Sequence, residues 1–186
     1  EAFPVGQKFD PKKLYAFDAI LTGQTGKSKL VSNNTSVGAY NIGLNVNYAF
    51  TDKIKAGLGY EILSGKDQTD TKDKIKSFNP IFGTNHAFNG FMDYFYVGNH
   101  INSTGLLDVF AKVNAKLNDK SSLGLWIHNF SSYAEIANGV KKQLGTEVDL
   151  QYNYTFTKDV AVGAGYSQMF ASEGMEVLKN NSDGNI

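Results

Sequence analysis

One sequence pattern occurs twice in this chain without a gap, as NYAFTDKIKAGLGY at residues 47–60 and as NYTFTKDVAVGAGY at residues 153–166. Asn, Tyr, Phe, Thr, two Gly and a final Tyr recur at matching positions. A less similar copy, NAKLNDKSSLG, lies at residues 114–124. In each copy apolar and polar residues alternate on both sides of a short polar turn, which is typical of a β-hairpin. The chain is therefore expected to reuse one strand–turn–strand unit.

The alternation also predicts the length of the turns. If residues 51–53, 118–120 and 157–159 are three-residue turns, every apolar side chain of one strand faces an apolar side chain of the next. The last of these turns predicts that Phe156 faces Val160. A two-residue turn would break the match.

The two faces of each strand differ so strongly that they indicate the class of protein. In a water-soluble sheet the apolar face packs into a core. Here the apolar face carries Tyr and Phe beside the turns, while the opposite face carries charged and amide groups. Aromatic girdles around a polar interior are typical of outer-membrane barrels, whose tilted strands of about nine to eleven residues cross the bilayer. We therefore interpret the apolar face as lipid-facing. The clearest example is residues 146–156, where Val148, Leu150, Tyr152, Tyr154 and Phe156 alternate with Glu147, Asp149, Gln151, Asn153 and Thr155.

Seven strands are predicted in all, and the connections alternate between short turns and long polar loops. The short turns, together with residues 10–13, are predicted to be periplasmic, and the loop at residues 23–36 and its counterparts extracellular. This pattern predicts an all-β fold, an antiparallel up-and-down transmembrane β-barrel. The strands are expected at residues 14–22, 37–50, 54–63, 105–117, 121–133, 144–156 and 160–171.

Composition excludes other classes. The chain has no cysteine, and no apolar run approaches the roughly 18 to 20 residues of a membrane helix. Net charge is zero and every basic residue is Lys. Because the bidentate guanidinium that suits phosphate backbones is missing, no nucleic-acid partner is predicted.

The polar face of the strands supplies candidate pore-lining residues. Rings of charged side chains set the ion preference of pores, and amides suit sugar hydroxyls. The alternative is that these groups only pair across strands and fill a polar interior. The candidates are Lys55, Glu61, Asp108, Lys112, Asn114, Lys116, Glu147, Asp149, Gln151 and Asn153.

The segment from residue 64 to 104 is too long to be a mere connection. Its first part, GKDQTDTKDKIK, is charged and is expected to be solvated or mobile. Its second part is dense in aromatic residues, which would not stay exposed to water without a partner. We expect this part to pack inward against Phe110 and Trp126 and to narrow the pore; the alternative is a short extracellular strand or helix. The candidate constriction residues are Phe78, Phe82, His86, Phe91, Asp93 and Tyr94.

A family resemblance adds to this prediction. The stretch FNPIFGTNHAFNGFMDYFYVGNH at residues 78–100, the alternating strands after it and the closing GMEVLK resemble the C-terminal part of the alginate-export family of outer-membrane barrels, especially its Bacteroidetes members. The resemblance begins near Tyr40. It implies a barrel of about eighteen strands, of which residues 1–186 would be the C-terminal part of one domain with the final strand absent. Because the polar face is mixed in charge and lacks Arg, alginate is the least supported of the implied solutes.

Catalysis, metals and cofactors are not predicted. His86, His100 and His128 lack the spacing of a metal site. A hydrolase inside the barrel would need an acid to orient His128 near Ser132, and the sequence places none at a convincing distance. TGQTGKS at residues 22–28 lacks the first Gly of a P-loop and is predicted to be a loop tip.

The predicted function is a porin-like channel in the bacterial outer membrane, for passive transport or export of a polysaccharide or a small polar solute. Its partners would be outer-membrane lipid and that solute. A further candidate partner is a larger outer-membrane complex of which the chain would be a component. The alternative is a small barrel with a packed interior that serves adhesion or assembly. Strand number separates the two, because about eight strands leave room only for side chains.

Overall fold

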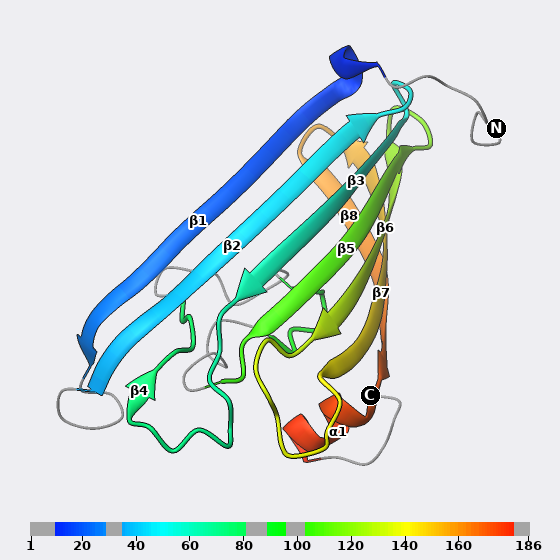
Figure 1. The fold of residues 1–186 in the computed structure, drawn as a ribbon. Helices are drawn as coiled ribbons and strands as arrows, with labels where there is room; N and C mark the ends of the chain where they lie inside the picture. Colours follow the sequence, from blue (N-terminus) through cyan, green and yellow to red (C-terminus); the bar gives the residue numbers. More distant parts are fainter. Residues whose placement is uncertain (1–9, 29–34, 81–88, 96–102, 181–186) are drawn as a thin grey trace.

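The structure is a computed structural model that describes residues 10–28, 35–80, 89–95 and 103–180 (Figure 1). The predicted all-β, antiparallel up-and-down fold is confirmed. Seven strands form one sheet in the order β1-β2-β3-β5-β6-β7-β8, and the short β4 pairs in parallel with β2. The elements are the 3-10 turn η1 (Pro11–Lys13), strands β1 (Leu14–Ser28), β2 (Thr35–Ala49), β3 (Ile54–Leu63), β4 (Lys74–Ile75), β5 (Leu106–Lys116), β6 (Ser121–Ser131), β7 (Gln143–Thr157) and β8 (Val160–Ala171), and helix α1 (Glu173–Lys179).

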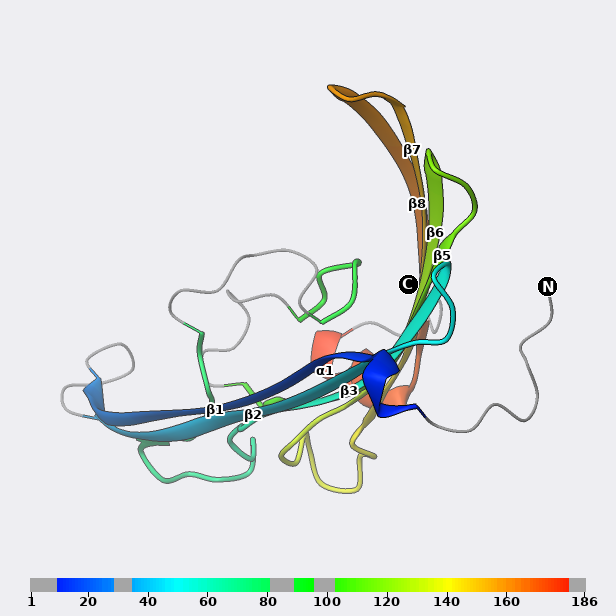
Figure 2. The same cartoon turned by 90° about the horizontal axis from the view of Figure 1, so that it is seen from above.

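The sheet is strongly curved and open. Seen from above it forms an arc with α1 on its concave side (Figure 2). β1 and β8 are the two ends of the strand order and do not pair with each other within the described residues. The short turns gather at one end of the strands, here called the turn end, and the long connections and α1 at the other, the loop end (Figure 1).

The registers of the repeated hairpins follow the sequence prediction, with one exception. Tyr48 faces Ala56 across β2 and β3, and the same rule holds across β5 and β6. The prediction that Phe156 faces Val160 is wrong: Thr157 faces Val160, the turn is only two residues long, and the register shifts between Thr155 and Thr157. This bulge at Phe156 takes up one residue, so the apolar side chains beyond it still face each other.

Three segments differ from the prediction at the loop end. β1 and β2 extend to Ser28 and back to Thr35, so most of the predicted loop at residues 23–36, including the supposed loop tip, is strand. β4 and α1 were not predicted. α1 lies where a polar loop was expected; it ends at Asn180, which adopts the left-handed conformation, and it buries Met175 completely.

The exposure of the two faces is the reverse of that in a soluble sheet. Large apolar side chains on the convex face are exposed, with Leu58 at 69 % and Tyr166 at 65 %. On the concave face Asp108, Glu147 and Asp149 are 0 % exposed. Because soluble domains bury apolar groups and expose charges, this arrangement fits a sheet whose convex face meets an apolar environment.

An apolar core nevertheless exists, at the loop end of the concave face. Leu106, Phe130, Leu144 and Met169 from the sheet pack with Met175 of α1. Phe78 and Phe95 from the long connection join the same cluster. α1 is short, and in the described part of the chain no helix is long and apolar enough to cross a bilayer.

Candidate functional site

The candidate pore-lining residues all lie on the concave face, and their charges are separated along the strands. Glu61 is paired with Asp108 near the loop end, whereas Lys55 is paired with Asn114 closer to the turn end. Lys112 and Asp149 lie at one level, on either side of Trp126. The acids Glu61, Asp108 and Glu147 thus lie toward the loop end, Lys55 and Lys116 lie toward the turn end with Asn114, Gln151 and Asn153 beside them, and Lys112 and Asp149 lie at the level between the two groups. The sequence indicated mixed charge but not this separation.

Two of the acids hold the long connection against the sheet through Asn89. The Nδ2 group of Asn89 donates to Oε2 of Glu61 at 2.8 Å and to Oδ2 of Asp108 at 3.1 Å. Glu61 also accepts a hydrogen bond from Asn41 at 2.7 Å. Asn89 is buried, so these charge-assisted bonds form in a place where losing them would leave unpaired polar groups.

A third acid completes the attachment. Oε1 of Glu147 accepts a hydrogen bond from the backbone N–H of Met92 at 2.9 Å. Gly90 lies directly on this carboxylate, and a Cβ atom there would overlap it. Gly90 also has φ +80, a conformation that side chains oppose. Strands β3, β5 and β7 therefore hold residues 89–92 together; this set of contacts is called the clasp.

Aromatic contacts place the same segment inward, as predicted. The rings of Phe91 and Trp126 lie 4.9 Å apart between centroids, and those of Phe95 and Phe130 lie 4.7 Å apart. The predicted packing against Trp126 is confirmed. Phe110 instead lies over Gly59, where a Cβ atom would collide with its ring. Because β5 and β6 pair without interruption, these large side chains need no bulge to face the concave side.

His128 has the orienting acid that the sequence did not reveal. Its Nδ1 lies 2.9 Å from Oδ2 of Asp108, and its ring is stacked between Phe110 and Phe130 at centroid distances of 5.2 and 5.4 Å. Ser132 does not join this pair: its hydroxyl donates to the carbonyl oxygen of Ala134 at 2.7 Å. The described contacts thus show an acid–histidine pair whose histidine packs between two aromatic rings. Ser132 forms its hydrogen bond with a different partner.

The concave face offers an excess of hydrogen-bond acceptors. Both carboxylate oxygens of Asp149, and Oε2 of Glu147, are buried without a hydrogen-bond partner among the described residues. The side-chain oxygens of Asn41, Asn45 and Asn47 share this state. Buried acceptors are costly unless a donor reaches them. This face therefore suits groups that donate hydrogen bonds, such as water, hydroxyl groups and ammonium groups.

The remaining candidate constriction residues are placed differently. Phe78 is part of the buried core, and Asp93 has a left-handed backbone with φ 57. The carbonyl oxygen of Tyr94 accepts a hydrogen bond from Lys179 of α1 at 3.0 Å. Burial raises the pKa of Tyr94 and lowers that of Lys179. Phe82 and His86 lie outside the described residues.

Sequence reasoning missed Asn89 and Gly90 as anchors of this site. The dipeptide Asn-Gly is a turn signal, and a turn inside an aromatic segment would have pointed to these residues. Their partners could not be read from the chain, because Glu147 is far away in sequence and belongs to another strand.

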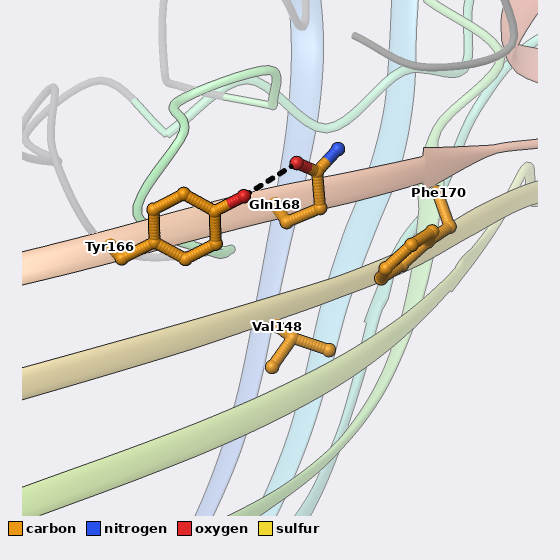
Figure 3. A pocket seen from close by; sticks show the side chains of 4 residues that line it. All are labelled: Val148, Tyr166, Gln168 and Phe170. Atoms are coloured by element: carbon orange, nitrogen blue, oxygen red, sulfur yellow. Dashed lines mark hydrogen bonds between the residues drawn. The ribbon is translucent and has the colours of Figure 1, made fainter.

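A groove of about 560 Å³ opens on the convex face beside the edge strand β8. It is lined by Val148, Tyr166, Gln168 and Phe170, and the hydroxyl of Tyr166 donates to Oε1 of Gln168 at 2.9 Å (Figure 3). This bond joins two polar groups on a largely apolar part of the face.

No group of three or more His, Asp or Glu side chains within the described ranges is arranged to hold a metal ion. Comparison with protein-family models found no match, and comparison with curated proteins found none either.

Proposed function

We propose that this chain forms part of an outer-membrane β-barrel that acts as a passive channel for a sugar-like or small polar solute. The reversed exposure of the two faces carries the proposal: charged groups are buried on the concave face while large apolar side chains are exposed on the convex face. A bilayer around the convex face would cover these apolar groups. The concave face would then line the channel.

The two open edges of the sheet support a barrel that contains more strands than those described. In lipid, each unpaired backbone group of β1 and β8 would cost several kcal/mol. Both edges therefore pair with further strands in the membrane. The resemblance to the alginate-export family suggests a barrel of about eighteen strands in total.

The chemistry of the concave face supports the class of solute. Its buried acceptors favour a solute rich in hydroxyl groups or water-bound cations. The clasp holds Phe91 and its neighbours over this face, so the segment would narrow the channel near its loop end. Aromatic rings suit the apolar C–H face of a sugar ring, and the polar acceptors beside them suit its hydroxyl groups.

Conductance in planar bilayers tests this function. Phe91→Ala removes a ring that leans on Trp126 over the concave face, and the conductance of the channel should rise. Phe17→Ala is the matched control, because Phe17 is exposed on the convex face. A folded, inserted protein that passes no current would contradict the proposal. An equal rise in both variants would contradict the constriction.

The core at the loop end favours a second candidate, a packed barrel that serves adhesion or assembly of a surface complex. Fully buried side chains such as Phe130 and Met169 fill part of the concave side. Liposome swelling in sugars of increasing size separates the two candidates. Folded protein that gives no swelling with any sugar supports the packed barrel.

A further inference from the structure

A pocket of about 530 Å³ lies at the loop end of the sheet, away from the clasp. Its walls come from β2, β4 and the connections at residues 64–76 and 132–142. The latter connection, in yellow, runs on the other side of the sheet from α1 (Figure 2). The residues that give the pocket its character are Gly38, Tyr40, Lys74, Lys76, Tyr133 and Lys142.

The walls of the pocket are fixed by hydrogen bonds. The backbone N–H of Gln68 donates to the carbonyl oxygen of Glu135 at 3.1 Å, and the N–H of Glu135 donates to Oδ1 of Asp67 at 2.7 Å. The hydroxyl oxygens of Tyr40 and Tyr133 lie 2.7 Å apart. The charged segment that was expected to be solvated or mobile is thus tied to a neighbouring connection. The pocket is formed by two connections that hold each other.

The charge of the pocket is positive. Lys76 is paired with Asp70 at 2.7 Å, and Lys142 donates to the carbonyl oxygen of Tyr133 at 3.0 Å. Asp67 is the acid among the described lining residues, so the pocket has three lysines against Asp67 and the paired Asp70. The lysines therefore exceed the acids that could neutralise them.

Lys74 contributes an ammonium group that is unpaired by the described part of the chain. Its side chain lies along Gly38, and a Cβ atom there would be 3.2 Å from Cε of the lysine. Within the described residues its Nζ has no hydrogen bond and no ion pair. Asp73, the next acid along the chain, accepts from the hydroxyl of Thr35. The glycine thus lets the lysine lie flat on β2 with its charge available to a ligand.

The pocket lies at the loop end of the convex face. Tyr40 shares its face of β2 with Ile42 and Leu44, which are exposed. Tyrosines at the end of an apolar belt lie at the level of lipid headgroups, and lysines above the belt extend toward phosphates. If the convex face lies in lipid, the pocket opens at headgroup level.

We propose that this pocket binds a phosphate group, supplied by the headgroup of an outer-leaflet lipid. The ammonium groups of Lys74 and Lys142 face the phosphate, and the Tyr40 and Tyr133 pair donates one hydroxyl hydrogen to it. Lysine acts as a point charge toward phosphate, so the absence of Arg is no obstacle. The lipid source rests on the proposed outer-membrane function.

Binding of diphosphoryl lipid A to the protein in a non-ionic detergent, measured by native mass spectrometry, tests the site. The double variant Lys74→Gln and Lys142→Gln should raise the Kd at least about tenfold, since charge-assisted hydrogen bonds are lost. The control is Lys120→Gln with Lys158→Gln, because both lysines are exposed in turns at the opposite end. Equal binding by the two double variants, with circular dichroism showing intact folding, overturns the site.

A second arm tests whether the phosphate group of the lipid is what the pocket recognises. Inorganic pyrophosphate that competes with lipid A shows that the phosphate group itself is recognised. Lipid A that binds while its dephosphorylated form binds equally well overturns the proposal.

The proposed phosphate site and the proposed channel can each be contradicted without the other. Loss of current in planar bilayers with retained phosphate binding removes the channel and keeps the site. Normal current in the Lys74 and Lys142 variant, together with unchanged lipid binding, keeps the channel and removes the site.

Discussion

The turn end and the loop end of this sheet are built by different means. At the turn end, strands are joined by two to four residues, and tyrosine and phenylalanine rings pair edge to face on the convex side, as Tyr48 with Phe50 and Tyr154 with Phe156. At the loop end, side chains pack into a core that would suit a soluble domain. The comparison teaches that the loop end buries part of its apolar groups by itself, whereas the turn end depends on its surroundings for their burial.

The largest expected effect comes from the core. Phe130 is fully buried between Phe95 and His128. Phe130→Ala should destabilise the protein by about 3 to 5 kcal/mol. Phe156→Ala, at a position that is 56 % exposed at the turn end, should cost about 1 kcal/mol or less in detergent. Urea denaturation compares them; equal losses would break the distinction between the two ends.

A charge on the convex face should cost nearly as much in a bilayer. Val148→Lys, in the groove beside β8, should destabilise by about 2 to 4 kcal/mol if the residue lies near the midplane. Asn153→Lys, on the concave face of the same strand and exposed, should have little effect. Folding assays in lipid vesicles measure both. A tolerated lysine at position 148 would argue that the convex face does not meet lipid.

The clasp gives a smaller and more local effect. Gly90→Ala should cost about 1 to 3 kcal/mol, because the residue has φ +80 and its Cβ atom would meet Glu147. Gly23→Ala is the control, since nothing lies within 4 Å of a Cβ atom there. Hydrogen exchange of the Met92 amide should become faster in the first variant alone. Unchanged exchange would mean that Glu147 does not hold the segment.

The smallest effect concerns the pair of Asp70 and Lys76, in the connection that forms one wall of the pocket proposed to bind phosphate. The hydrogen bond from Lys76 lowers the pKa of Asp70 from 3.8 to about 2. A lowered pKa stabilises the folded state at neutral pH, and this contribution is lost as the pH falls from 3.8 through about 2. Carbon NMR should show a higher pKa for Asp70 in Lys76→Met than in the parent, while the backbone N–H of Lys72, 2.9 Å from Oδ1, still lowers it. Identical titration in the parent and the variant would contradict the pairing.

The turn end could be predicted almost completely from the sequence, because its structure depends on neighbours in the chain. Alternation with period two fixes which side chains share a face, and turn length fixes the register. The exception is the bulge at Phe156, which keeps the faces matched on both sides and so leaves no trace in the alternation.

The loop end could be predicted only in outline. Inward packing follows from the aromatic content of the long connection, but its anchors do not. Asn89 reaches Glu61 and Asp108, and Met92 reaches Glu147, across long stretches of sequence. α1 and β4 are too short for a hydrophobic period to reveal them.

The contacts of the clasp also restrict the order in which the parts of the protein can fold. Every main strand pairs with its predecessor in the sheet, so the sheet can grow one hairpin at a time with mostly local contacts. Met92, however, precedes its partner Glu147 by 55 residues. The segment cannot settle until β7 has been added. A slip of one residue in β7 would turn Glu147 to the opposite face, so closure of the clasp serves as a check that the later strands have docked in the correct register.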